Sequence, residues 1–299
     1  MRPDLLPLAW VLSSVLVACT PEPGGTDAAP TAPPNPAPPP SASTAAVAPS
    51  QATLPPQLPV NVPRERTILK MGPDGETQCF DFHSTLSDML RVKPAGPVLV
   101  ALHGRGSSRA AFARLAPDLQ RRGIGVVAVD LRSGREHAGV ENLSAMHYRR
   151  VHGRDAEVSE DAADIPFALA RLREYAPHSR LALLGEGPAA TQALRYVAES
   201  PGAVEALFLF SPEPVEGCDP ARDNPRIQVQ VYATCGHGAE ERQRLLDAVR
   251  GIDPRWLTMF VPPDDVAAAP GAATLHVEPD SDRDRQRGPL YERMLALRE

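Results

Sequence analysis

A regular alternation of short apolar runs and amphipathic segments, which begins at residue 97, constrains the fold more than any other feature of this sequence. Near-continuous apolar runs are typical of strands in parallel sheets, because helices cover both faces of such sheets. The alternation therefore predicts an α/β domain with a doubly wound, mostly parallel sheet and right-handed crossovers. The runs that we expect to be strands are 97–103, 124–130, 180–185, 206–211 and 227–233.

The segments between these runs have apolar residues at helical spacing. In 107–122 a single stripe holds Phe112, Leu115 and Leu119, and 158–175 has a similar stripe. Two more helices are expected over 189–199 and 239–249. Because ligands of such sheets bind beyond the carboxyl ends of the strands, we look for a site in the loops that follow them.

The first 19 residues do not belong to this pattern. Arg2 precedes the apolar stretch 5–17, which is too short to span a membrane. The stretch ends in Leu-Val-Ala-Cys, which resembles the lipobox of bacterial lipoproteins. The resemblance implies a signal peptide over 1–18, cleavage before Cys19 and a lipid on its sulfur; an ordinary secretory signal is the alternative. An aspartate after the cysteine would resemble a signal for retention in the inner membrane. Thr20 stands there instead, so we expect a lipid anchor at the outer membrane of the cell envelope.

Proline dominates the segment that follows. Residues 20–63 hold 14 of the 34 prolines and only two charged residues, Glu22 and Asp27. Such a segment cannot bury a core and stays extended. We therefore expect 19–63 to be a lipidated, disordered tether, with a proline-rich motif for a partner as the alternative, and 64–299 to be the folded domain. The net charge of −6 lacks the basic excess of nucleic-acid binders.

The loops resemble those of α/β-hydrolases of the esterase or dienelactone-hydrolase type. His103, Gly104, Arg105 and Gly106 resemble the oxyanion loop of these enzymes, whose backbone N–H groups face the substrate carbonyl. The stretch 127–134 is similar to their DLRGHG segment, and 181–199 to their strand, nucleophile elbow and helix. The resemblance covers about residues 80–299 and implies a three-layer sandwich.

The resemblance also implies that the nucleophile is missing. The family motif is G-x-S-x-G, and the aligned residues 185–189 read GEGPA, so Gly187 stands where the nucleophile should be. Acyl-enzyme chemistry cannot start from a residue without a side chain. Glu186 could act on water as a base, but in the family geometry the residue before the nucleophile points elsewhere.

The other two members of a catalytic triad also depart from the family pattern. The acid should follow 227–233, but the next loop has no carboxylate; Glu213, after the preceding strand, could substitute. The histidine should follow the last strand. If that strand is 274–278, no histidine follows; if it is 257–261, the next histidine is His276, which itself reads as a strand residue. The triad therefore looks degenerate.

Several other residues could carry chemistry. Cys235 and His237 could form a thiolate pair, but exported cysteines tend to pair with each other. Since Cys218 and Cys235 follow neighbouring strands, we predict a disulfide between them, with Cys79 left over. Ser107 and Ser133 are alternative nucleophiles near the expected pocket, although Ser107 also suits a helix N-cap.

The segment 134–157 holds scattered histidines and occupies the place of a lid over the pocket. Its spacings match no metal-binding motif, and no other motif calls for a metal or a cofactor. Two functions follow. The chain is a tethered binding or scaffold module without standard serine-hydrolase activity, or it is an active ester or acyl hydrolase with a displaced nucleophile. An exported α/β domain with only superficial likeness to hydrolases is a third interpretation.

Overall fold

The computed structural model describes residues 67–72, 74–83, 96–236, 238–261, 292–294 and 296–298. All of them belong to one compact unit, Leu54–Glu299. Cys19, His237 and His276, together with the expected signal peptide and tether, lie outside the described residues, so what we expect of them stays a prediction. None of the helices in the described ranges has the length and apolar character needed to cross a bilayer.

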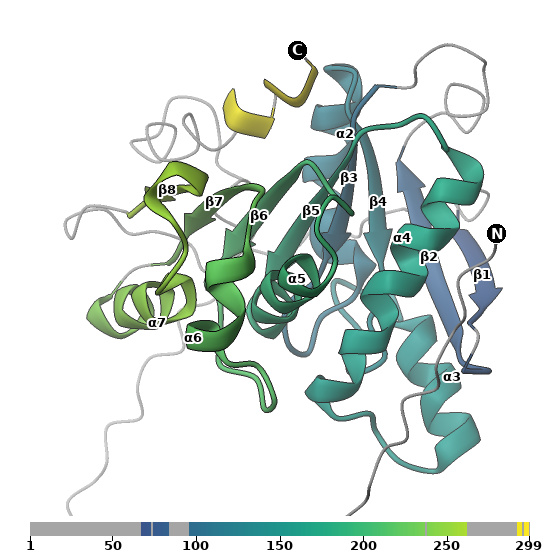
Figure 1. Ribbon diagram of the computed structural model, residues 1–299. Helices are drawn as coiled ribbons and strands as arrows, with labels where there is room; N and C mark the ends of the chain where they lie inside the picture. Colours follow the sequence, from purple (N-terminus) through teal and green to yellow (C-terminus); the bar gives the residue numbers. More distant parts are fainter. Residues whose placement is uncertain are drawn as a thin grey trace, which may run out of the picture. The chain divides into compact units, whose positions relative to one another are not determined.

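One sheet runs through this unit, with the strand order β1-β2-β4-β3-β5-β6-β7-β8 (Figure 1). From β4 to β8 neighbouring strands are parallel, whereas β1 and β2 are antiparallel to each other and β2 is antiparallel to β4. The predicted fold class is therefore confirmed. The strands are β1 Thr67–Met71, β2 Thr77–His83, β3 Val98–Leu102, β4 Gly125–Val129, β5 Leu181–Glu186, β6 Ala206–Phe210, β7 Gln230–Thr234 and β8 Leu257–Phe260.

The helices follow the predicted alternation, with differences at their starts. The expected helix over 107–122 is a 3-10 turn followed by a short α-helix, and the expected helix over 158–175 divides in the same way. Two helices, α3 and α6, were not expected. The α-helices are α2 Leu115–Arg121, α3 Leu143–His152, α4 Asp164–Tyr175, α5 Pro188–Glu199, α6 Pro220–Asp223 and α7 Ala239–Val249; the 3-10 turns at the two divided starts are Arg109–Phe112 and Val158–Ala163.

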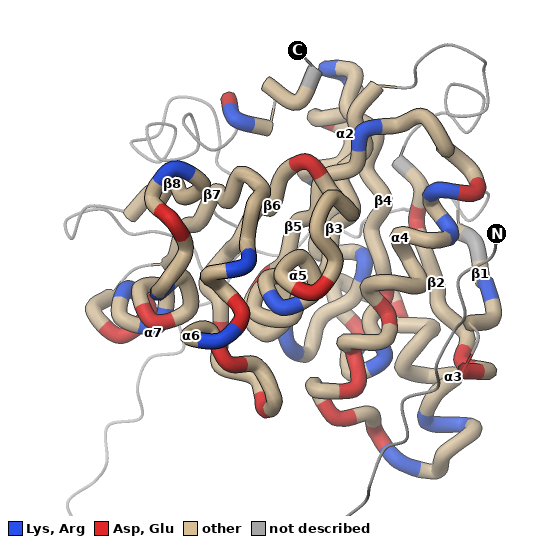
Figure 2. Tube along the Cα trace, viewed as in Figure 1, with Lys and Arg blue, Asp and Glu red and all other residues tan. Residues whose placement is uncertain are grey.

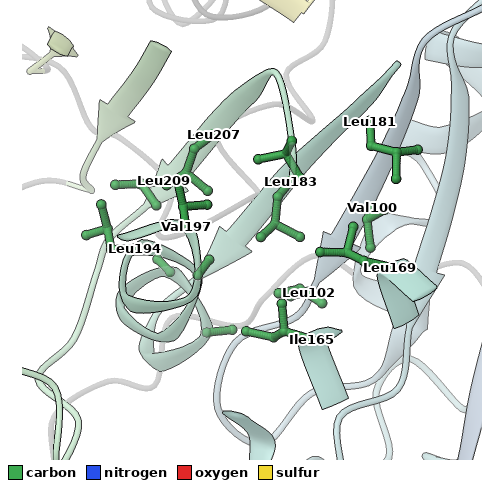
Figure 3. Packing of buried hydrophobic residues seen from close by; sticks show 14 of the residues in the cluster. Val100, Leu102, Ile165, Leu169, Leu181, Leu183, Leu194, Val197, Leu207 and Leu209 are labelled. Carbon is green, nitrogen blue, oxygen red and sulfur yellow. The ribbon is translucent and has the colours of Figure 1, made fainter. Parts of the chain in front are cut away.

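The sheet separates two hydrophobic clusters, as a three-layer sandwich requires. The larger cluster joins the sheet to α4, α5 and α7, and Figure 3 shows Leu194 and Val197 of α5 beside Leu207 and Leu209 of β6. The second cluster joins the other face to α2. Successive strand residues point to opposite faces, so uncharged runs such as β6 supply both clusters. Figure 2 shows that charged residues lie outside the central strands β3, β4 and β6.

The predicted disulfide between Cys218 and Cys235 is wrong for this structure, which has both thiols free, as is that of Cys79. Cys235 is buried in the larger hydrophobic cluster. Strand β6 ends at Phe210, well before Cys218, so Cys218 lies on the outer loop that leads into α6. The two cysteines follow neighbouring strands in sequence, but the length of that loop gives their thiols different surroundings.

Candidate functional site

A cavity of about 280 Å³ opens at the carboxyl ends of the parallel strands. Its wall comes from the loop after β3, the end of β5, the loop after β6 and the first turns of α7. This is the edge of the sheet at which ligands of doubly wound α/β folds bind. The cavity therefore lies where the sequence analysis expected a site.

His103 anchors the loop that follows β3. The backbone N–H of Leu131 donates to Nε2 of His103 at 2.9 Å, so the ring proton is on Nδ1, which donates to the carbonyl of Gly104 at 2.9 Å. Burial lowers the pKa of His103 to about 4. A neutral histidine with both nitrogens engaged holds the loop in place and is not available as a base.

A buried arginine, Arg109, connects the end of β4 to β2. Arg109 donates from Nη1 to Asp130 Oδ2 at 2.6 Å and lies 3.1 Å from a carboxylate oxygen of Asp81. Burial raises the pKa of Asp130 to about 6, although Arg109 opposes the shift. Asp130 also accepts from the backbone N–H of Leu143. This network joins β2, the end of β4 and the start of α3.

The nucleophile elbow is present as backbone geometry. Strand β5 ends at Glu186, α5 begins at Pro188, and Gly187 between them has φ 58° and ψ −127°. This left-handed conformation is costly for residues other than glycine. A Cβ built on Gly187 would lie 3.5 Å from Glu213 Oε1, an ordinary contact. The turn therefore keeps the strained shape and the space for a nucleophile without the side chain.

Two glutamates line the cavity next to the elbow. Glu213 lies 3.6 Å from Nε of Arg105, whose side chain is 60% exposed. Glu186 also lines the cavity and packs against Gly104, where a Cβ would lie only 3.1 Å from Glu186 Cγ. The expectation that Glu186 points away from the site is therefore wrong, because Gly104 leaves room for its side chain.

A third carboxylate fills the place after β7 that the sequence analysis found without an acid. Oε2 of Glu241 accepts from the backbone N–H of Gly236 at 2.7 Å and from Oγ of Ser211 at 3.0 Å. Ser211 has a φ of 43°, a strained value for a non-glycine residue, and lines the same cavity. Glu241 lies in the first turn of α7, and sequence reasoning missed it because helix residues were set aside.

Two arginines and one histidine complete the wall. Arg244 lies 3.3 Å from Glu240, which is largely exposed, and Arg105 is paired as described above. Burial lowers the pKa of the half-buried His137, so the imidazole is neutral at pH 7. The cavity thus presents three carboxylates, two guanidinium groups and a neutral imidazole, which is suited to a small polar ligand with several hydrogen-bonding groups.

Of the alternative nucleophiles, only Ser107 reaches the cavity. Its Oγ is buried and has no hydrogen-bond partner among the described residues. Ser133 instead donates to Asp161 at 2.5 Å and lines a separate recess without room for a water molecule. Cys235 is buried in the core, where burial raises the pKa of its thiol and disfavours the thiolate.

The segment 134–157, expected as a possible lid, contributes one residue to the cavity, His137. A bridge between His137 and Val140 closes a tight turn, and most of the rest of the segment is α3, which packs beside β2 (Figure 1). No cluster of three His, Cys, Asp or Glu side chains suited to a metal occurs within the described ranges.

The family model described as serine aminopeptidase, S33 (Hydrolase_4) matches residues 93–244. Among solved structures, a cold-adapted esterase from an Arctic intertidal metagenomic library is 15% identical with a TM-score of 0.54, covering 78% of this chain and 93% of the esterase. The esterase Pf2001 of Pyrococcus furiosus is 15% identical with a TM-score of 0.51, covering 76% and 89%.

A dienelactone hydrolase from Anabaena variabilis is 16% identical with a TM-score of 0.50, and the match covers 68% of this chain and 88% of the hydrolase. No curated protein matches the sequence. At these identities the solved structures support the fold alone, and the order of the strands agrees with it. The family match covers just over half of the sequence, from residue 93, ahead of β3, through the elbow and into α7, so this chain belongs to the serine aminopeptidase S33 family of α/β-hydrolase-fold proteins.

Proposed function

We propose that this protein is a non-catalytic member of its family, a binding module tethered to the cell envelope that holds a small polar ligand in the cavity at the elbow. The observation that carries the proposal is Gly187, a residue without a side chain at the point where the family needs its nucleophile. Removal of a catalytic serine in such enzymes costs roughly 10⁶-fold in turnover. Ligand binding needs only the cavity and its polar wall, both of which remain.

Covalent labelling tests the loss of activity. Purified protein is incubated with a fluorophosphonate, which reacts with activated serine hydroxyls, and its intact mass is measured beside that of an active esterase. We expect the esterase to gain the phosphonyl mass and this protein to remain unmodified. Stoichiometric labelling of the folded wild-type chain would refute a non-catalytic role, and peptide mapping would then identify the reactive residue.

An active hydrolase with a displaced nucleophile is the second candidate, and Ser107 favours it. The Oγ of Ser107 is buried without a described partner, and the neutral imidazole of His137 lines the same cavity. On this alternative the wild-type protein is labelled, Ser107→Ala abolishes labelling, and Ser133→Ala leaves it intact because Ser133 faces Asp161. On the main proposal all three proteins stay unlabelled.

The tether is proposed from the cysteine at the end of the apolar leader and the proline-rich segment behind it. Cells that express the full chain are grown with radiolabelled palmitate, and membranes are separated from soluble material. We expect the wild type to carry label and to sediment with the outer membrane. Cys19→Ser should lose both properties, whereas the matched variant Cys218→Ser should keep them. A labelled, membrane-bound Cys19→Ser protein would rule out the anchor.

A further inference from the structure

The helix after the elbow begins with a residue that cannot donate a hydrogen bond. Pro188 is the first residue of α5, and proline has no backbone N–H. In serine hydrolases of this fold, the N–H of the residue after the nucleophile and one N–H from the loop after β3 together hold the oxyanion of the transition state. In this chain the first of these two donors is missing, whichever residue stands at position 187.

A carboxylate also stands close to the same point. Glu213 Oε1 would lie 3.5 Å from a Cβ at Gly187. Two hydrogen bonds hold the backbone of residue 213 beside the elbow, since the N–H of Glu213 donates to the carbonyl of Gly187 at 3.1 Å and Thr191 Oγ1 donates to the carbonyl of Glu213 at 2.6 Å. The ion-pair partner of Glu213, Arg105, is largely exposed, so solvent screening weakens the compensation of the carboxylate charge.

We infer that the elbow disfavours an oxyanion independently of the missing nucleophile, through the absent N–H of Pro188 and the negative charge of Glu213. This inference rests on the proposed non-catalytic function and deepens it. A negative charge that develops near position 187 meets one donor fewer and a carboxylate of like sign. Restoring the serine alone therefore restores a hydroxyl group without the surroundings that stabilise its transition state.

The test compares variants that carry a serine at the elbow. Gly187→Ser is made alone and together with Pro188→Ala, with Glu213→Gln, and with both. The rate constant for reaction with a fluorophosphonate is measured by intact mass, and peptide mapping confirms the site. In this reaction the serine oxygen forms a bond to phosphorus, the P–F bond breaks, fluoride leaves and the hydroxyl proton passes to water.

We expect Gly187→Ser alone to react slowly and the Gly187→Ser/Pro188→Ala protein to react about 100-fold faster, the usual effect of one oxyanion donor. Gly187→Ser/Glu213→Gln should also react faster than Gly187→Ser. The matched control is Gly187→Ser/Pro220→Ala, because Pro220 is likewise the first residue of a helix but lies outside the cavity. The control should react at the rate of Gly187→Ser.

Equal rates for Gly187→Ser and the variants with changes at 188 and 213 would overturn the inference, and so would the absence of labelling in all of them. Far-UV circular dichroism and thermal melts accompany each protein, and Glu213→Gln gives an independent route if Pro188→Ala alters the start of α5. The proposed function would fail on a different result, namely labelling of the wild-type protein. Position 187 takes no part in that result, because the wild type has a glycine there.

Discussion

At the scale of single residues, Asp161 is a buried acid that lines a small recess together with Pro188, next to the elbow. Its side chain is buried and accepts from both the N–H and the hydroxyl of Ser133. Burial, followed by the nearby carboxylate of Asp164, raises the pKa of Asp161 to about 7; Arg132 and the two hydrogen bonds oppose the shift. When the pKa of an acid is higher in the folded state than in the unfolded state, the free energy of unfolding of the protein decreases as the pH rises from the unfolded pKa to the folded pKa.

We predict that Asp161→Asn makes the stability of the protein less dependent on pH between 4.5 and 8. Asparagine keeps the shape and an acceptor for Ser133 but never carries the charge. The free energy of unfolding of the variant should gain about 2–4 kcal/mol relative to wild type over this interval. Urea denaturation at both pH values measures it, with the exposed Asp155→Asn as control. Parallel pH profiles for wild type and Asp161→Asn would contradict the assignment.

Single residues also show where sequence reasoning stops. Gly187 could be aligned with the nucleophile because a strand and a helix of ordinary length flank it, and the structure gives it the left-handed backbone of an elbow. The orientation of Glu186 could not be predicted, because it depends on the space beside Gly104, a contact between distant segments. Glu241 escaped notice for the same reason, since its acceptor role needs the fold that brings Gly236 to it.

At the scale of elements, Asn142 connects three of them. Its Oδ1 caps α3 by accepting from the N–H of Ala145 at 2.8 Å. Its Nδ2 donates to the carbonyl of Leu131 after β4 at 3.0 Å and to that of Ser107 after β3 at 3.3 Å. The side chain is buried, so the loss of these bonds would leave carbonyl groups without a partner.

We therefore predict that Asn142→Ala lowers the free energy of unfolding by about 2–4 kcal/mol, the sum of a lost cap and of unsatisfied buried groups. The matched control is Asp219→Ala, which removes the cap of α6 from an exposed position and should cost about 1 kcal/mol or less. Equilibrium urea unfolding measures both. Equal losses for the two variants would show that Asn142 serves as a cap alone.

The elements themselves were predictable to different degrees. The runs that became β3 to β7 are mostly apolar, and α7 has clear helical spacing, so their limits were within three residues of those observed. The expected helix over 158–175 begins as a 3-10 turn, in which Asp161 turns inward to meet Ser133. Strands β1 and β2 were missed because each carries polar residues and pairs antiparallel at one edge of the sheet.

At the scale of the whole domain, the two hydrophobic clusters share one sheet. Phe208 belongs to the cluster beside α2 and stacks on Tyr232 with ring centroids 5.1 Å apart. Trp256, the last residue of the 3-10 turn just before β8, packs against the cluster on the other face. The second tryptophan of the chain, Trp10, lies in the expected signal peptide, so fluorescence of the processed protein reports on the β7–β8 edge alone.

Because the two clusters share one sheet, we expect a cavity made on one face of the sheet to destabilise the other face as well. Phe208→Ala should destabilise the protein by about 3–5 kcal/mol, while the exposed Leu69→Ala should have little effect. Unfolding is followed in urea by far-UV circular dichroism and by fluorescence of Trp256. Because one sheet joins both clusters, we expect the two signals to shift together and to share a midpoint in each variant. A Phe208→Ala protein whose dichroism midpoint falls while its fluorescence midpoint stays at the wild-type value would mean that the β7–β8 edge unfolds as a separate unit.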